Sequence, residues 1–146
     1  QALAAKALDF SSLVRRLADD GRLSLPAATG LPVCTYHDSC HHKRGLRAQE
    51  EPRDLLGRAG YAISEMFESD ACCGMGGSYS LKFPEIAAPM LERKLYNIAQ
   101  SGAATVALDC PGCLLQIQGG LDKRASQIKV RHTAELLAEV LRGRRS

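Results

Sequence analysis

The sequence predicts a Rossmann-like α/β domain of three layers, with a small, mostly parallel sheet of about four strands. Three observations favour this fold class. Short apolar segments alternate with helical segments, glycine or proline stands at several of the junctions, and the composition of 45% hydrophobic and 24% charged residues is that of an ordinary globular domain. Alternating strands and helices favour a parallel sheet whose two faces are covered through right-handed crossovers.

The first half of the chain is predicted to contain two helices and two strands. From Leu3 to Ala18 apolar residues recur at intervals of three and four, the period of an amphipathic helix, and this helix stops near Gly21. After a loop marked by proline and glycine, a short apolar run is typical of a buried strand, and a later helical segment ends at Gly60. The other elements of this half are the strand 31–37, the helix 50–59 and the strand 61–67.

The second half is predicted to contain two strands and three helices. A glycine-rich stretch over 74–77 forms a loop, and Pro84 stands where the first residue of a helix is expected, so that a helix opens there and ends before Gly102. Two more helices each follow a short strand, the first of them after Gly112. These elements are the helix 84–100, the strand 105–108, the helix 113–121, the strand 128–131 and the helix 133–141.

The length of 146 residues fits a single domain, which we expect to span residues 1–146 as a fragment of a longer protein. Within it, residues 1–24 are expected to form an N-terminal helix and linker, and residues 32–141 the core. The opening without Met, directly in helix-like sequence, is the basis of the expectation that further domains exist.

Charge and hydropathy argue against several classes of function. The formal net charge is only +3, and the basic residues gather at Arg142, Arg144 and Arg145, so nucleic-acid binding has little support. No apolar run reaches the roughly 18–20 residues that cross a bilayer, and the chain opens without the features of a signal peptide. We therefore expect no nucleic-acid partner, no transmembrane segment, and a location in the cytoplasm or, through partners, at the inner face of the membrane.

Six cysteines carry most of the chemical information in the sequence. They are too few and too clustered for a disulfide scaffold, which favours metal or redox chemistry. Five of them follow predicted strand ends, and because the carboxyl ends of parallel strands border one crevice, we expect them to converge. These candidate metal ligands are Cys40 after the first strand, Cys72 and Cys73 after the second, and Cys110 and Cys113 after the third.

Thiolates are the ligands that iron-sulfur clusters and zinc select, and four suffice for either. The glycines after Cys73 and the Pro-Gly between Cys110 and Cys113 allow tight loops at these ligands. The adjacent Cys72 and Cys73 favour a cluster, because neighbouring cysteines rarely bond to each other but can ligate different irons. A lone C-x-x-C also serves thiol-disulfide exchange or zinc binding, so those alternatives stay open.

The arrangement resembles the cysteine-rich CCG domain family, whose pattern is a cysteine, a spacer, Cys-Cys-Gly, a similar spacer and C-x-x-C. Here 31 residues separate Cys40 from Cys72, and 36 separate Cys73 from Cys110. The resemblance covers residues 32–141. The family includes the cysteine-rich subunit of heterodisulfide reductase, the iron-sulfur subunits of glycolate oxidase and of anaerobic glycerol-3-phosphate dehydrogenase, and the lactate-utilisation iron-sulfur proteins.

The local sequence is most similar to the lactate and glycolate branch of this family, in the stretches TYHDSCH, CCGMGGSYSLKFPEIAAPMLERK and SGAATVALDCPGCLLQI. The resemblance implies a Rossmann-like α/β domain in which the same five cysteines hold an iron-sulfur cluster, of the 4Fe-4S kind and noncubane in heterodisulfide reductase. Zinc has been assigned in other members and is the alternative cofactor. An isolated fragment exposed to oxygen can lose its cluster.

The resemblance also implies an electron-transfer domain of a lactate- or glycolate-oxidising complex, the redox part of an oxidoreductase and not catalytic alone. The expected partners are other redox domains or subunits, namely a ferredoxin-like iron-sulfur domain and a flavin dehydrogenase subunit. Two other functions stay open. One is a zinc-stabilised docking module; the other is a metal-free thiol-disulfide redox domain that uses Cys110 with Cys113, or Cys72 with Cys73.

Several residues near the cysteines have a structural interpretation. Cys34 is interpreted as a small buried hydrophobic residue, and His37 and Asp38 are expected to order the strand-to-helix turn, with a mixed Cys/His zinc site or a proton relay as the alternative. The stretch CCGMGG is not a dinucleotide fingerprint, so no NAD or FAD site and no catalytic side chain are predicted. The residues expected to be solvated or packed are Lys43, Arg44, Arg47, Tyr79 and Phe83.

Overall fold

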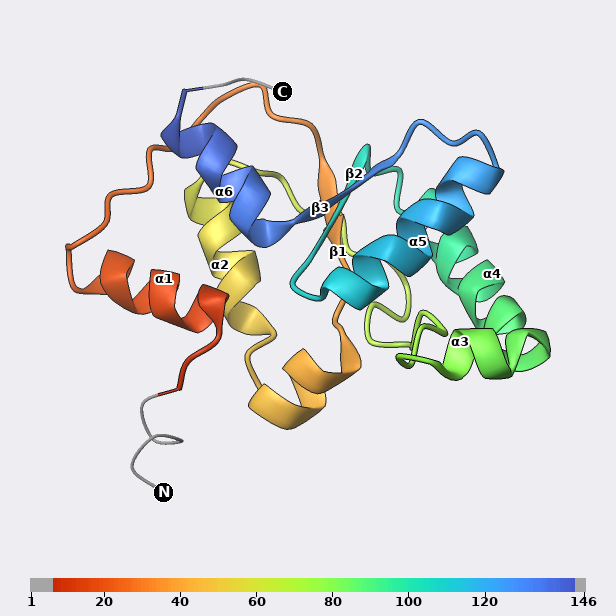
Figure 1. Ribbon diagram of the computed structural model, residues 1–146. Helices are drawn as coiled ribbons and strands as arrows, with labels where there is room; N and C mark the ends of the chain where they lie inside the picture. The colour runs from red at the N-terminus through yellow and green to blue at the C-terminus, as the bar shows by residue number, and fades with distance from the viewer. Residues whose placement is uncertain (1–6, 144–146) are drawn as a thin grey trace.

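A computed structural model describes residues 7–143, and over these residues the chain forms a small, open, three-stranded parallel sheet with helices around it (Figure 1). The strand order is β1 (Cys34–Tyr36), β2 (Thr105–Leu108) and β3 (Lys129–His132), with Thr35 opposite Val106 and Val106 opposite Val130. The α/β fold class that the sequence predicts is therefore confirmed. Two of the basic residues near the C-terminus, Arg144 and Arg145, lie outside the described residues.

Helices cover both faces of the sheet (Figure 1). One face carries α1 (Phe10–Asp19), α2 (Glu50–Arg58) and α6 (Thr133–Leu141), and the other carries α4 (Pro84–Gln100) and α5 (Pro111–Lys123). Every residue of β1 and β2 is buried, as expected for parallel strands between two helical layers.

Two hydrophobic cores lie on the two faces of the sheet. Successive strand residues point to opposite faces, so Ala107 packs with α2 and α6 while its neighbours Val106 and Leu108 pack with α4 and α5. Leu55 and Ile117, one in each core, are fully buried. Burying a side chain of this size contributes about 1.5–3 kcal/mol, so each core helps to fix the loops at the carboxyl edge of the sheet.

The predicted strand 61–67 is reduced to a single bridge between Ile63 and Cys34. Cys34 donates to Ala62 O at 2.9 Å and accepts from Ser64 N at 2.8 Å, which starts a parallel ladder. The ladder stops because the Thr35 hydroxyl accepts the Met66 N–H at 3.0 Å, in place of a backbone carbonyl. The segment then leaves the sheet as a loop.

The first helix begins later than the periodicity predicts. Its described part starts at Phe10, and Leu3 to Lys6 of the predicted helix lie outside the described residues. The Asp9 side chain accepts the Ser12 N–H at 3.1 Å and caps the helix, which fixes its start.

Two short helical segments were not predicted. A π-helical turn, η2 (His41–Leu46), follows Cys40, and the single turn α3 (Tyr79–Lys82) follows the glycine loop. The predicted helix 113–121 is longer, because Pro111 occupies its first turn and it runs to Lys123. The remaining predicted elements agree within a few residues. In the described part of the chain, no helix combines the length and the apolar character that crossing a membrane requires.

Candidate metal centre

The cysteines expected at the carboxyl edge of the sheet come from three connections. Cys40 follows β1 and begins η2, Cys110 follows β2 and stands at the N-cap of α5, and Cys113 lies in the first turn of that helix. Cys72 and Cys73 lie on the loop between the Ile63 bridge and α3. The order of elements along the chain thus brings distant cysteines to one region.

Three of the five predicted ligands influence one another. The sulfur atoms of Cys73 and Cys113 lie within 4.8 Å of each other, and the pKa values of Cys73, Cys110 and Cys113 are each shifted by a neighbouring thiol. Cys73 and Cys113 are buried, whereas Cys110 is half-buried. All six cysteines, including these, are free thiols. The structure therefore assembles a cluster of sulfur atoms that is partly open to solvent at Cys110.

Contact among these thiols separates their pKa values. Hydrogen bonding with Cys113 lowers the pKa of Cys73 against the opposing effect of burial, and His37 lowers it further. The same partner, Cys113, lowers the pKa of Cys110, again against burial, and the backbone N–H groups of Cys113 and Gly112 add to the effect. The pKa of Cys113 itself is raised by its two thiol neighbours. The thiolate is the form of cysteine that binds metal, so the lowered pKa values of Cys73 and Cys110 favour metal binding.

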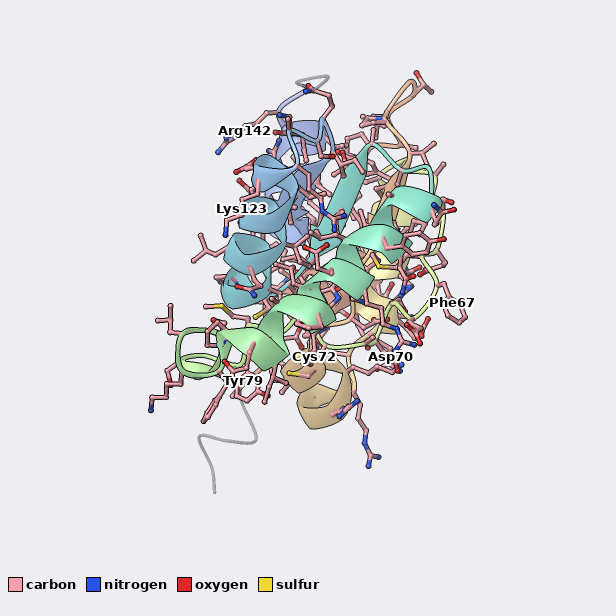
Figure 2. The ribbon with its side chains drawn as sticks, turned by 90° about the vertical axis from the view of Figure 1, so that its right-hand side faces the viewer. Phe67, Asp70, Cys72, Tyr79, Lys123 and Arg142 are labelled. Atoms are coloured by element: carbon pink, nitrogen blue, oxygen red, sulfur yellow. The ribbon has the colours of Figure 1, made fainter. Side chains whose placement is uncertain are left out.

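Cys72 and Cys40 are placed differently. Cys72 is half-buried, and its sulfur accepts the Gly74 N–H at 3.3 Å. Figure 2 shows Phe67, Asp70 and Cys72 along their loop, with the Phe67 ring pointing away from the ribbon. Cys40 is exposed. Among the described residues, the group of donor atoms that lie within 4.8 Å of one another includes neither of these two cysteines.

Glycine is required at the position after the cysteine pair. Gly74 has a φ of +83°, and a Cβ there would lie 2.6 Å from the carbonyl oxygen of Ala87 in α4. The loop can therefore approach the helix only without a side chain at this position. This close packing holds Cys73 against the core.

His37 lies beside two of these thiols. One donor atom each of His37, Cys73 and Cys113 lies within 4.8 Å of the others, and all three residues are buried. The histidine follows β1 directly, and its Nδ1 lies 3.1 Å from Ser69 O. This bond orders the turn as expected from the sequence, whereas the approach of the ring to these two thiols follows from the fold.

Asp38 completes the ordering of the same turn. Its carboxylate accepts two hydrogen bonds from Arg53, at 2.7 and 2.9 Å, and one from the Ser69 hydroxyl at 2.7 Å. Burial raises the pKa of Asp38, but these hydrogen bonds outweigh burial and hold it below its ordinary value. The expectation that Asp38 orders the turn agrees with these contacts.

A buried lysine near the centre was not predicted. Lys94 is 1% exposed and donates from Nζ to Glu68 O at 2.6 Å and to Ser69 O at 3.1 Å. Burial lowers the pKa of Lys94 to about 8, an effect that the nearby Cys73 opposes. The signal in the sequence was its position in an otherwise apolar stripe of α4, between Leu91 and Ile98. Its role is to fasten the loop that leads to the cysteine pair.

The residue before Cys110 is fixed from the sheet and from α1. Asp109 accepts hydrogen bonds from the Tyr36 hydroxyl at 2.8 Å and from the Ser11 hydroxyl at 3.1 Å. Burial, together with Asp109, raises the pKa of Tyr36 well above its ordinary value, so this phenol stays a donor. The carboxylate thereby ties α1 to the strand end that carries the C-x-x-C segment.

The other residues singled out in the sequence lie around this centre. Lys43 pairs with Asp70 at 2.9 Å, and the ring of Tyr79 in α3 packs 5.3 Å from the ring of Phe83, the exposed residue that follows this helix. Cys34 is fully buried, and burial raises its pKa to about 11, which agrees with its interpretation as a core residue. Arg44 and Arg47 are exposed, as expected for solvated residues.

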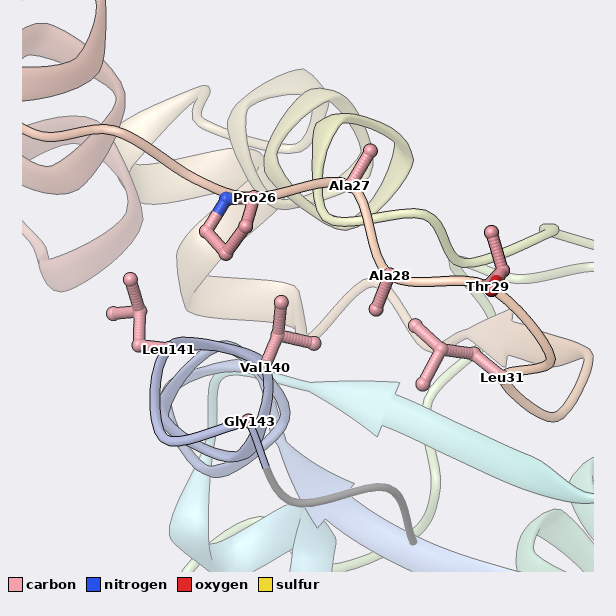
Figure 3. A pocket seen from close by; sticks show the side chains of 8 residues that line it. All are labelled: Pro26, Ala27, Ala28, Thr29, Leu31, Val140, Leu141 and Gly143. Atoms are coloured by element: carbon pink, nitrogen blue, oxygen red, sulfur yellow. The ribbon is translucent and has the colours of Figure 1, made fainter.

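A separate hollow of about 430 Å³ lies between the 26–31 segment and the end of α6 (Figure 3). Pro26, Leu31 and Val140 are among its lining residues, and none of the residues that line it is charged or a cysteine. It offers no group that could bind a metal or carry out chemistry, so the cysteine centre is the candidate functional site.

The fold and the site together define the class of this chain as a cysteine-rich α/β domain, with cysteines on three connections that follow strands. The sequence profile of the cysteine-rich CCG domain matches residues 34–118, more than half of the chain. The chain belongs to this family. The resemblance noted in the sequence is thus confirmed.

Curated relatives have names that agree with one branch of the family. The chain is 39% identical over 105 residues to lactate utilization protein A of Shouchella clausii, covering 70% of this chain and 44% of the relative. It is 36% identical over 137 residues to the probable glycolate oxidase iron-sulfur subunit of Bacillus subtilis, covering 92% and 30%. Lactate utilization protein A of Lysinibacillus sphaericus is 34% identical over 138 residues, covering 94% and 59%.

The chain spans 43–44% of the length of the first three relatives compared, all of which are named lactate utilization protein A.

Proposed function

We propose that this chain is the iron-sulfur electron-transfer domain of a longer protein, with the cluster held by the five cysteines of the CCG pattern. The observation that carries the proposal is the approach of the Cys73 and Cys113 sulfur atoms to within 4.8 Å of each other at the sheet edge where Cys110 precedes α5. The proposed ligands are Cys40, Cys72, Cys73, Cys110 and Cys113, and the proposed cluster is of the 4Fe-4S kind, in its noncubane form.

The residues of the site fit such a group. Cys73 and Cys110 favour the thiolate, Gly74 lets the loop approach the core, and the buried Nε2 of His37 has no hydrogen-bond partner among the described residues. When bound, an iron-sulfur cluster supplies one-electron transfer at a potential set by charge, hydrogen bonds and burial. The chain contributes the thiolates, the Gly74 N–H directed at Cys72, and the buried charge of Lys94 near Cys73.

The names of the relatives support a role in the oxidation of lactate or glycolate. In that role the cluster would pass electrons from a flavin dehydrogenase subunit or a ferredoxin-like iron-sulfur domain towards an acceptor. We further propose that residues 1–146 form one domain of the longer protein, with residues 32–141 as its core. Its location would be the cytoplasm or, through partners, the inner face of the membrane.

The first test is the iron and sulfide content of the full-length protein, purified without oxygen, in the wild type and three variants. Cys73→Ala and Cys113→Ala are expected to lose most of the iron and sulfide, because each removes a thiolate from the contacting cluster. Cys34→Ala is the matched control: Cys34 is buried like Cys73 but lies in the core of the sheet. Equal iron content in all four proteins would contradict the proposal.

One observation favours zinc as a second candidate cofactor. The close approach of one imidazole and two thiols provides donors that zinc also selects. In that case the metal would stabilise a docking module and would have no redox role. Stoichiometric zinc without sulfide would support the docking module. Binding of neither iron nor zinc would favour a thiol-disulfide domain.

A further inference from the structure

We infer that His37 is a nitrogen ligand of the metal group held at this centre, together with the thiolates of Cys73 and Cys113. The inference rests on the proposed function only in that these cysteines bind a metal. It adds an imidazole to a ligand set that the CCG pattern describes with cysteines alone. The supporting observation is geometric: one donor atom each of His37, Cys73 and Cys113 lies within 4.8 Å of the other two.

The hydrogen bonding of the imidazole leaves Nε2 free to bind metal. Nδ1 lies 3.1 Å from Ser69 O, and because a carbonyl oxygen only accepts, Nδ1 carries the hydrogen. In the neutral ring Nε2 then presents a lone pair. Metal-binding histidines usually have this arrangement, with the other ring nitrogen donating to a carbonyl or carboxylate.

The ring is held in place before any metal binds. Ser69 O also accepts from Asp38 N at 3.1 Å and from Lys94 Nζ at 3.1 Å, so the carbonyl that orients the ring is itself fixed. The backbone N–H of His37 donates to Ala107 O at 2.9 Å, in line with the strands. The imidazole is therefore anchored at its backbone and at Nδ1, and only Nε2 is unused.

The unused Nε2 of His37 is buried, and buried polar atoms normally have a hydrogen-bond partner. Nε2 of His37 has no hydrogen-bond partner among the described residues, and a ring nitrogen of His37 lies within 4.8 Å of the sulfur atoms of Cys73 and Cys113. Bonds from zinc to sulfur and to nitrogen are about 2.3 and 2.0–2.1 Å long. Three donors within 4.8 Å of one another can thus meet on one metal ion after small side-chain adjustments.

The other histidines lie outside the group of donor atoms within 4.8 Å of one another. His42 is equally buried, its Nε2 pairs with Asp9 at 3.2 Å, and its Nδ1 also has no partner among the described residues. His132 caps α6 by accepting the Ala134 N–H at 3.1 Å, and His41 is exposed. His42 is therefore the matched control for His37, since it lies in the same region and has a different partner.

The test uses the full-length protein, loaded with iron and sulfide without oxygen and made with histidine labelled by the heavy nitrogen isotope. Pulsed electron paramagnetic resonance of the paramagnetic cluster measures the magnetic coupling of nitrogen to iron. We expect a strong coupling that changes with the isotope in the wild type and in His42→Gln, and its loss in His37→Gln. We also expect His37→Gln to bind its metal about tenfold more weakly, or worse, in competition with a chelator.

The labelled wild type and a second variant guard against misfolding of His37→Gln. His37→Cys supplies sulfur in place of nitrogen, so it is expected to keep the metal without the nitrogen coupling. A loaded wild-type cluster without strong nitrogen coupling, or coupling that persists in His37→Gln, would overturn the inference and leave the proposed cluster intact.

If the wild type binds zinc without sulfide, X-ray absorption at the zinc edge replaces the resonance experiment. One nitrogen scatterer that disappears in His37→Cys would support the inference while the iron-sulfur proposal fails. A zinc shell of sulfur alone would overturn the inference, and binding of neither metal would overturn both.

Discussion

Arg53 links three parts of the structure beside the metal centre. Its guanidinium donates to Asp38 in the turn after β1, donates to Glu65 in the loop at 2.6 and 3.0 Å, and lies 4.6 Å from the centroid of the Tyr36 ring. The Asp38 side chain is 3% exposed, so its charge depends on this partner. At the scale of the residue, this is the ion pair whose loss should matter most.

Replacing Arg53 with Met is expected to lower the free energy of unfolding by about 3–5 kcal/mol, because it leaves the buried carboxylate of Asp38 without its partner. Urea unfolding of the 146-residue chain measures the change. Arg58→Met is the control, because Arg58 pairs with Asp19 and Asp54 at the surface and its loss should change the free energy of unfolding little. Equal losses in the two variants would contradict the special role of Arg53.

A second prediction concerns the glycine of the CCG pattern. Gly74→Ala places a methyl group against Ala87 O, so the loop must move away from α4, and the full-length protein should retain less iron than the wild type. Gly77→Ala is matched: its φ of +62° is also left-handed, but open space surrounds the added Cβ. It should cost only about 1–2 kcal/mol of stability with iron content preserved. Iron analysis and thermal unfolding distinguish the two, and a Gly74→Ala protein with full iron content would contradict the account.

At the scale of the element, the sequence predicted the helices and strands whose limits are set by residues within or next to them. Pro84 and Gly102 set the limits of α4, and the apolar run 105–108 is β2. The strand expected over 61–67 failed because its continuation depends on Thr35 and Arg53, which lie elsewhere in the chain. No local pattern revealed that the ladder would be interrupted there.

The site residues divide in the same way, into those that a local sequence pattern reveals and those whose roles depend on residues distant in the sequence. The five cysteines were predicted as ligands because their spacing and their places after strands are visible in the sequence, and two of them, Cys73 and Cys113, lie within 4.8 Å of each other. His37 was expected mainly to order the turn, and Lys94 was not predicted at all, because each acts through Ser69 O, on a loop distant from both in the sequence. Their roles arise from tertiary contacts, and the sequence signal for Lys94 was only its place in the apolar stripe of α4.

Helix α1 provides a prediction at this scale. Asp9 caps the helix through Ser12 N and also contacts His42 Nε2 at 3.2 Å, which ties α1 to the turn after Cys40. Asp9→Ala should lower the free energy of unfolding by about 0.5–2 kcal/mol, as measured by urea unfolding. Asp20→Ala, at the exposed opposite end of α1, is expected to change it little. A larger effect at Asp20 would mean that the cap does not hold this helix.

At the scale of the whole molecule, the sheet and its two cores form a stable support for loops that meet at one edge. The loops bring His37, Cys73 and Cys113 together from distant parts of the chain, so a metal bound there would cross-link three connections. In the proposed domain, metal binding would therefore order the loops at this edge of the sheet more than it would order the two hydrophobic cores.

Metal removal should accordingly have a local effect. Hydrogen exchange of the full-length protein, compared with and without its metal, is expected to speed up over residues 38–48 and 66–78 when the metal is removed. Strand β2 and helix α6 should keep their protection, because they are held by buried apolar contacts. Uniform loss of protection across the domain would instead mean that the metal supports the whole fold.

The most direct test of the central claim is the iron and sulfide content of the anaerobically purified full-length protein, with an electron paramagnetic resonance spectrum after oxidation and reduction. Iron and sulfide bound by a further domain would be present in both the wild type and Cys73→Ala, so the difference between the two proteins reports the cluster of this domain. We predict a difference of about four irons and four sulfides per chain, with a paramagnetic signal that the variant lacks. No difference in iron or sulfide between the wild type and Cys73→Ala would contradict the claim.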